Sequence, residues 1–209
     1  LASAIVPVYT SSAHKKPMTN PTPKILVPLA DGFEEIEAVT VIDVLRRADL
    51  DVTVAALGNL QVRGAHQMTI EADVILADLD LSVFGAVCLP GGMEGTLTMM
   101  EDERLLGFVR DLHERGSLVS AICAAPMVLA RAGIEAGQQV TSHPAVRERL
   151  GEAEVCSEPR VVRSGALITS QGPGTSMEFA LALVEEICGA AKAEELAAAM
   201  VAAVPPSSH

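Results

Sequence analysis

Two short apolar runs enclose an amphipathic helical segment near the start of the chain, and this unit limits the fold more than any other feature. The apolar runs lie at residues 24–29 and 51–56, and residues 34–48 between them place apolar side chains at helical spacing. Two strands joined by a helix in this way pair in parallel, and a parallel sheet needs helices on both faces. The unit therefore predicts an α/β fold with a mostly parallel central sheet.

The alternation of strands and helices continues along the chain, with one interruption at residues 61–70, whose pattern predicts a small edge hairpin. Thr175 and Glu178 are spaced as a capping box at the start of a helix. The further elements that we expect are strands at 86–89, 118–122 and near 140, 161 and 167, helices at 102–115, up to 132, at 176–188 and at 193–203, and a helical turn at 145–150. Together they predict a doubly wound α/β sandwich, in which ligands bind at the carboxyl ends of the strands.

The length and composition of the chain favour a single domain. A chain of 209 residues with 49% apolar residues can bury one substantial core, which we expect at residues 24–203, between tails at 1–23 and 204–209. The net charge of −12 argues against an electrostatic nucleic-acid interface. No apolar run approaches the length that spans a membrane, so we expect no membrane partner.

Cysteine usage and the first residues bear on the compartment. The four cysteines lie at positions 88, 123, 156 and 188, too far apart for a structural zinc site, which is typical of a reduced intracellular protein. Residues 1–23 contain no Asp or Glu and several Ser and Thr, which is typical of a flexible tail or of an organelle transit remnant. We expect a cytoplasmic protein, with chloroplast or mitochondrion as the alternative.

Cys123 lies where the apolar run 118–122 meets a helical pattern. Ala121 and Ala125, two residues to either side, leave room for a sharp strand-to-helix turn of the nucleophile-elbow kind. A side chain at such a turn points out of the sheet beside the unpaired N–H groups of the next helix. The pattern predicts a reactive thiol, although a lone cysteine is also typical of an inert buried position.

One acidic side chain falls on the apolar face of the first predicted helix. At 100° per residue, Glu37 shares an arc with Val41 and Val44. An unpaired carboxylate there is costly, so its pKa is expected to rise, and a protonated Glu37 facing Cys123 could donate a hydrogen bond to the thiolate. The alternative is a carboxylate satisfied by backbone N–H groups at the start of the helix.

The loop after the predicted strand at 86–89 can reach the same edge of the sheet. Its glycines, Gly91 and Gly92, let the backbone approach a ligand, and their N–H groups with that of Ala124 could form an oxyanion hole. A Pro-Gly-Gly sequence is also typical of an ordinary turn. A phosphate-binding site is not expected, because the glycine-rich motifs of such sites are missing.

His143 follows a short predicted strand and is the candidate to pair with the thiol, since a nearby histidine commonly poises a catalytic cysteine. His113 lies on a charged helix, where we expect it to be solvated. His66 lies in the predicted hairpin, where a turn or interface role is expected.

Five motifs occur in order with fitting gaps, and together they resemble the DJ-1/PfpI superfamily over about residues 24–200, specifically its DJ-1 branch of Parkinsonism-associated deglycases. The resemblance implies a flavodoxin-like sandwich, a homodimer and a reactive cysteine at Cys123, with Glu37 and His143 beside it and the backbone of Gly92 and Ala124 as the oxyanion pocket. The motifs are DGFEEIEA at 31–38, LPGG at 89–92, AICAAP at 121–126, TSHP at 141–144 and TSQGPGTS at 169–176.

The resemblance implies a cofactor-independent glyoxalase or deglycase acting on small 2-oxoaldehydes, such as methylglyoxal or glyoxal, or on glycated adducts. In this hypothesis the Cys123 thiolate adds to the aldehyde and Glu37 moves a proton between the two carbons. An alternative is an oxidative-stress sensor or chaperone whose Cys123 is oxidised to the sulfinate. A third is a cysteine hydrolase with His143 as base, although no carboxylate that would orient this histidine is obvious.

Overall fold

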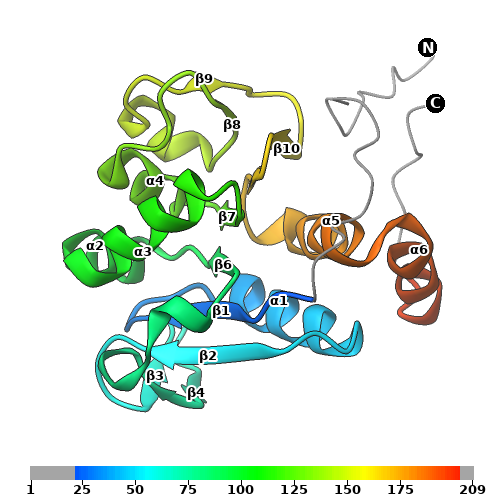
Figure 1. Cartoon of the computed structure of the whole chain (residues 1–209), viewed down its shortest axis with the longest axis horizontal. Helices are drawn as coiled ribbons and strands as arrows, with labels where there is room; N and C mark the ends of the chain where they lie inside the picture. The colour runs from blue at the N-terminus through cyan, green and yellow to red at the C-terminus, as the bar shows by residue number, and fades with distance from the viewer. Residues whose placement is uncertain (1–21, 203–209) are drawn as a thin grey trace.

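The computed structural model describes residues 22–202, which form a central sheet with helices on both faces (Figure 1). The sheet has seven strands in the order β10-β11-β7-β6-β1-β2-β5, and all neighbours are parallel except β10 and β11. The strands of this sheet are β1 (Ile25–Leu29), β2 (Val52–Ala56), β5 (Val74–Ile75), β6 (Ala86–Leu89), β7 (Leu118–Ile122), β10 (Val161–Ser164) and β11 (Leu167–Ser170). The predicted fold class is confirmed.

Helices cover both faces of this sheet, as a parallel sheet requires. One face is covered by α1, α5 and α6, and the other by α2, α3 and α4, which lie on opposite sides of the strands in Figure 1. The helices are α1 (Glu35–Arg47), α2 (Met93–Glu101), α3 (Glu103–Glu114), α4 (Pro126–Ala132), α5 (Ser176–Cys188) and α6 (Ala190–Ala199).

Alternation along the buried strands explains why the two hydrophobic clusters form. Within β1, Val27 and Leu29 pack with α1 and α5, whereas Leu26 packs with the helices of the other face. Successive side chains of a strand point to opposite faces, so an all-apolar strand supplies both cores. Cys123 contacts both clusters, because it follows β7 at the edge where the two layers meet.

Two short pairs of strands lie outside the central sheet. The predicted hairpin forms from β3 (Gln61–Arg63) and β4 (Thr69–Glu71), which make a separate two-stranded sheet, while β5 takes the edge of the central sheet. The other pair is β8 (Gln139–Val140) with β9 (Glu154–Val155). A 3₁₀ turn at Pro144–Arg149 replaces the predicted helical turn.

Three details differ from the sequence-based expectations. Helix α2 was not expected, and α6 runs over 190–199 rather than 193–203. The capping box is wrong: Thr175 makes no side-chain cap to α5, and Glu178 instead binds Arg160. The predicted tails lie outside the described residues, apart from positions 22 and 23, and the domain limits 24–203 stay a prediction.

The topology brings four loops to one edge of the sheet. Strands β1, β6, β7 and β11 are adjacent and parallel, so their carboxyl ends lie together. The segments that follow them are residues 30–34, 90–92, 123–125 and 171–175. Within residues 22–202, each helix is too short or too polar to cross a lipid bilayer.

Candidate active site

Cys123 occupies a left-handed backbone position directly after β7. Its φ is 65°, a conformation that costs a residue with a side chain about 1–2 kcal/mol. The surrounding backbone holds it there, because the Cys123 N–H donates to the Ser170 carbonyl at 3.0 Å and the Ala125 N–H donates to the Ile122 carbonyl at 3.0 Å. Backbone strain of this kind persists only where neighbouring contacts enforce it, as these two hydrogen bonds do. The partly buried thiol therefore lies on the strained strand-to-helix turn that the sequence predicts.

Glu37 is fully buried in the first turn of α1, with 0% of its surface exposed. Its Oε2 accepts the Gly91 N–H at 2.8 Å, and its own N–H donates to the Glu34 carboxylate at 2.8 Å. The other oxygen, Oε1, makes no conventional hydrogen bond to a described residue. The neighbouring group that does interact with this carboxyl is the Cys123 thiol. The structure therefore brings together the two predicted residues, and only half of the carboxyl is satisfied by backbone.

The two glycines after β6 are required by close packing. A methyl group at Gly91 would lie 2.6 Å from both Cys123 Cβ and Glu37 Oε2. Gly92 has a φ of 91°, and a methyl there would collide with the carbonyl oxygen of Gly32. Only glycine allows such close approach together with a positive φ. The Pro-Gly-Gly sequence therefore does more than turn the chain, since it lets the β6 loop contact both the thiol and the carboxyl.

Burial sets the protonation of the pair. It raises the pKa of Glu37 to about 7, against the lowering effect of hydrogen bonds from Cys123 and Gly91. Burial, and next the charge of Glu37, raise the pKa of the Cys123 thiol to about 12. A proton on Glu37 removes the charge that adds to the effect of burial on the thiol, so the protonation states of the two groups are coupled. The reactive thiol that the sequence predicts therefore does not have a low pKa in this structure, because burial and the charge of Glu37 both raise it.

Of the three backbone amides that the sequence offers for an oxyanion hole, those of Gly92 and Ala124 lie beside the sulfur, whereas the Gly91 N–H donates to Glu37 Oε2 instead. The N–H groups of Gly92 and Ala124 hydrogen-bond to Cys123 and lower the pKa of its thiol, although by less than burial raises it. Such donors can stabilise negative charge on the sulfur or on an oxygen bonded to the attached carbon.

His143 is placed by the elbow itself, because its N–H donates to the Cys123 carbonyl at 2.9 Å. Its ring Nδ1 accepts the Ala145 N–H at 3.2 Å. A neutral imidazole whose Nδ1 accepts carries its hydrogen on Nε2, so it is a donor on that side. This arrangement disfavours His143 as the base of a hydrolase.

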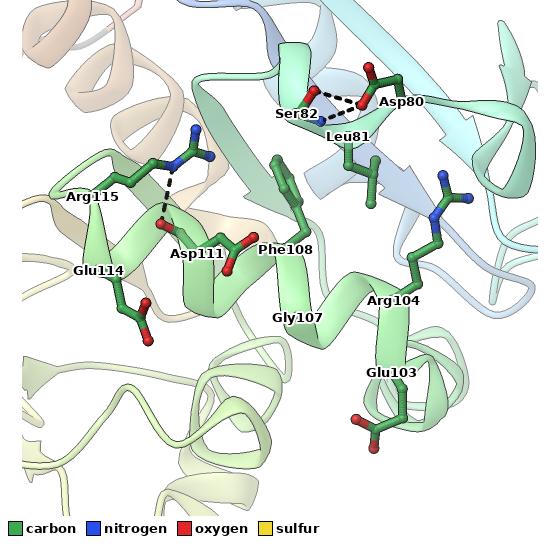
Figure 2. A pocket seen from close by; sticks show the side chains of 10 residues that line it. All are labelled: Asp80, Leu81, Ser82, Glu103, Arg104, Gly107, Phe108, Asp111, Glu114 and Arg115. Carbon is green, nitrogen blue, oxygen red and sulfur yellow. Dashed lines mark hydrogen bonds between the residues drawn. The ribbon is translucent and has the colours of Figure 1, made fainter.

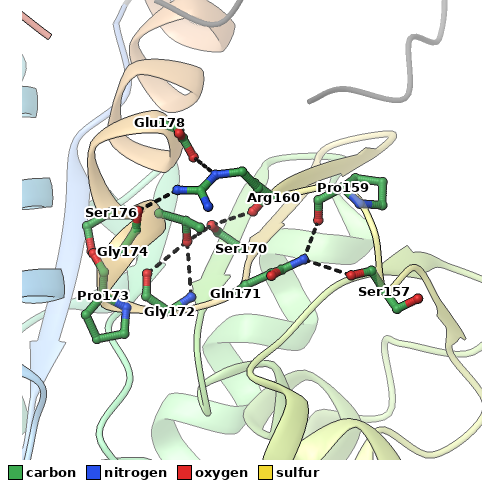
Figure 3. Close-up of polar contacts among 11 residues, drawn as sticks. Ser157, Pro159, Arg160, Ser170, Gln171, Gly172, Pro173, Gly174, Ser176 and Glu178 are labelled. Carbon is green, nitrogen blue, oxygen red and sulfur yellow. Dashed lines mark hydrogen bonds and ion pairs between the residues drawn. The ribbon is translucent and has the colours of Figure 1, made fainter. Parts of the chain in front are cut away.

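The turn after β11 is a part of the site to which the sequence assigned no role. A methyl group built on Gly172 would lie 3.5 Å from His143 Cδ2 and 4.0 Å from Cys123 Sγ. Arg160 holds this turn through Glu178 and the Gly174 carbonyl, at 2.7 and 2.6 Å (Figure 3). The motif 169–176 was the only available signal, and it does not say that the turn faces the thiol.

One group of potential metal ligands occurs within residues 22–202, formed by Glu34, Glu35 and His66. Its carboxylates already have partners: Glu34 accepts the Glu37 N–H, and Glu35 accepts the N–H of His66 at 2.6 Å and lies 3.0 Å from its Nδ1. These contacts fix the hairpin against α1, so the group is explained without an ion.

A surface groove of about 570 Å³ lies between residues 80–82 and α3 (Figure 2). Leu81 points across it toward α3, whereas Ser82 Oγ donates to Asp80 Oδ1 at 2.7 Å, and Arg104 donates to the Leu76 carbonyl. The groove shares no lining residue with the cysteine site and contains no nucleophilic thiol. The candidate active site is therefore the one around Cys123.

Comparison with known proteins finds similar sequences and a similar fold. Residues 23–186 match the sequence profile described as the DJ-1/PfpI family. Protein DJ-1 homolog B of Arabidopsis thaliana is 43% identical over 180 residues, which are 85% of this chain and 41% of that protein. The chain therefore spans less than half of the length of this relative.

Two further similarities cover nearly whole proteins. The glutathione-independent glyoxalase DJR-1.2 of Caenorhabditis elegans is 37% identical over 173 residues, 82% of this chain and 91% of that protein. The crystal structure of Drosophila melanogaster DJ-1beta has a TM-score of 0.85 at 40% identity and covers 88% of this chain and 100% of that one.

Proposed function

This chain belongs to the DJ-1/PfpI family, and on that basis we propose that it converts small 2-oxoaldehydes, such as methylglyoxal and glyoxal, to 2-hydroxy acids. The proposal assigns Cys123 as the nucleophile, Glu37 as the acid–base group and no cofactor. The observation that carries it is the contact between a strained thiol and a fully buried carboxyl with a pKa of about 7. The relative named as a glutathione-independent glyoxalase supports the same reaction class.

The first step would form a bond between carbon and sulfur. With the proton on Glu37, the Cys123 thiolate attacks the aldehyde carbon, and the carbonyl electron pair moves to oxygen. The N–H groups of Gly92 and Ala124, which bind Cys123, would donate to that oxyanion. The Glu37 proton then neutralises the oxyanion and leaves a hemithioacetal and a carboxylate.

The second step would move hydrogen between the two substrate carbons. The Glu37 carboxylate removes the proton from the sulfur-bearing carbon to give an enediolate. The hydroxyl proton on that carbon passes to the neighbouring enolate oxygen, and Glu37 returns its proton to the neighbouring carbon. A pKa near 7 suits both directions of this transfer at neutral pH. The product is a thioester, and water cleaves its acyl–sulfur bond to release the 2-hydroxy acid and the thiol. The sum is one aldehyde and one water giving one acid.

The test is the formation of lactate from methylglyoxal by the purified protein. We expect Cys123→Ala to abolish lactate formation, and Glu37→Gln to abolish it while Cys123 still forms the hemithioacetal. Cys156→Ala is the matched control, because that thiol is also partly exposed but lies outside the site, and it should behave as wild type. Full activity in Cys123→Ala would refute the proposal.

Sensing of oxidants is a second candidate, favoured by the same contact. Two equivalents of peroxide would convert the Cys123 thiolate to a sulfinate, each delivering one oxygen and leaving as water, and a protonated Glu37 could donate to a sulfinate oxygen. Mass spectrometry after mild peroxide decides this candidate. Selective oxidation at Cys123 together with negligible turnover of aldehydes would favour sensing, and equal oxidation of Cys156 would argue against it.

We also propose that the active form is a homodimer. The outward face of α1 exposes Ile36 and Val39 at 56% and 48%, and Met68 of the hairpin is 55% exposed. The Met68 N–H donates to Glu35, so the hairpin and α1 form one apolar surface. A second copy of this surface is the self-complementary partner that a twofold dimer requires.

A further inference from the structure

The turn at residues 171–175 lies beside the elbow because of strand register. Strand β11 pairs in parallel with β7, and Ser170 lies opposite Ile122. The residues that follow the two strands are therefore neighbours, and the Cys123 N–H donates to the Ser170 carbonyl at 3.0 Å. This register places Gly172 next to the sulfur.

Glycine at position 172 is not required by the fold. Its φ of 164° and ψ of −169° are extended backbone that any residue adopts. A methyl group there would lie 3.5 Å from His143 Cδ2 and 4.0 Å from Cys123 Sγ, both ordinary contact distances. Gly91 differs, because a methyl there would overlap Cys123 and Glu37. Any other residue at position 172 would therefore add a carbon in contact with both Cys123 Sγ and the His143 ring.

The turn is held firmly, so such a carbon would stay where it is built. Thr175 Oγ1 accepts the Gly172 N–H at 3.1 Å and lies 2.7 Å from Ser170 Oγ. Arg160 binds the Gly174 carbonyl at 2.6 Å and Glu178 at 2.7 Å, as Figure 3 shows. These contacts tie the turn to the start of α5, which fixes the distance between residue 172 and the sulfur.

From this geometry we propose that Gly172 is a specificity-determining residue, which sets the size of the group that can lie beside the carbon bonded to Cys123 Sγ. A carbon attached to the sulfur must place its substituents within contact distance of the walls around the sulfur. Gly91 and Gly92 are also walls without a side chain, but Gly172 is the one of these three at which a methyl group would make only ordinary contacts. The inference rests on the proposed function for its substrate class, a 2-oxoaldehyde whose second carbon carries a substituent. The steric claim itself concerns any reagent that bonds to this thiol.

The test compares Gly172→Ala with Gly174→Ala. Both substitutions add one methyl to the same turn, but the methyl at position 174 meets no atom within 4 Å. In Gly172→Ala we expect kcat/KM to fall least for glyoxal, more for methylglyoxal and most for phenylglyoxal. The loss of kcat/KM for methylglyoxal should exceed the loss for glyoxal by about 10-fold or more, because one methylene in a hydrophobic pocket changes kcat/KM by about 10–200-fold. Gly174→Ala should leave the three rates in their wild-type proportion.

A second readout separates this inference from the proposed activity. Iodoacetamide and 2-iodopropanamide both alkylate a thiolate with loss of iodide and differ by one methyl on the reacting carbon. Their rates at the Cys123 peptide, measured by mass spectrometry and divided by the rates with N-acetylcysteine, report space beside the sulfur without any turnover. We expect Gly172→Ala to lower the 2-iodopropanamide rate selectively. If wild type turns over no aldehyde but this selectivity appears, the proposed function fails and the inference stands.

The inference would be overturned if the ratio of the 2-iodopropanamide rate to the iodoacetamide rate were the same in Gly172→Ala and Gly174→Ala. Failure of Gly172→Ala to fold would also overturn it, because it would contradict the extended backbone and ordinary contacts described above. Arg160→Gln is the complementary variant, since it adds no atom near the sulfur and loosens the turn. It should admit 2-iodopropanamide more readily than wild type, and an unchanged ratio would show that the turn does not set the available space.

Discussion

Replacing Glu37 by glutamine should make the fold more stable than wild type at pH 8. The pKa of Glu37 is raised to about 7 in the folded protein, against 4.5 for an ordinary glutamate. An acid whose pKa is higher in the folded than in the unfolded state stabilises the fold fully below its unfolded pKa, here pH 4.5, and this contribution is lost as the pH rises through 7. The difference of 7 − 4.5 = 2.5 pKa units corresponds to about 3 kcal/mol. Glutamine keeps a carbonyl oxygen for the Gly91 N–H and carries no charge.

The assay is urea unfolding at several pH values between 5 and 8. Wild type should lose about 3 kcal/mol of stability more than Glu37→Gln over the titration, nearly all of it below pH 7.5. Glu194→Gln on the exposed side of α6 is the control for the loss of one negative charge, and it should follow wild type. Parallel curves for wild type and Glu37→Gln would refute the claim that burial holds a charged Glu37 at a cost.

Three further results are expected. Gly91→Ala should lower the free energy of unfolding in urea by about 1–3 kcal/mol and abolish lactate formation, because its methyl would lie 2.6 Å from Cys123 Cβ. Wild-type stability of this variant would contradict the close approach. Cys123→Gly should have a free energy of unfolding in urea about 1 kcal/mol higher than that of Cys123→Ala, because φ is 65° there, and equal stabilities would argue against the left-handed backbone. Ile36→Lys should convert a dimer to a monomer in light scattering, whereas a monomeric wild type would exclude the α1 surface as an interface.

Much of the fold follows from local pattern, and the exceptions have physical causes. All five residues of β1 are buried, and this is visible as an unbroken apolar run. Helix α2 was missed because its sequence contains Gly95 and Thr96, which are poor helix formers. Both residues are buried, and a methyl on Gly95 would lie 3.1 Å from the Phe33 nitrogen in the loop after β1. Tertiary packing therefore outweighs helix propensity at α2.

Some features of the site likewise follow from local sequence, and others depend on tertiary contacts. The helical arc predicts that Glu37 is buried, and the small residues around Cys123 predict the sharp turn, since both are properties of neighbouring residues. The partner of Glu178 could not be predicted, because Arg160 reaches it only through the pairing of β10 and β11. The raised pKa of the Cys123 thiol does not follow from the residues around it in the sequence either, because it depends on burial in the folded protein and on the charge of the distant Glu37.

The tie between α1 and the loop after β6 has a consequence for the order of assembly. Gly91 accepts the Glu34 N–H and donates to Glu37, which lies 54 residues earlier, so neither loop is placed until β1 and β6 have paired. The wall at Gly172 is added last, because it follows β11 in the sequence and needs the pairing of β11 with β7. A chain that is still being synthesised therefore carries Cys123, Glu37 and Gly91 before it carries His143 and Gly172. During that interval the thiol is open to larger electrophiles than the finished fold admits.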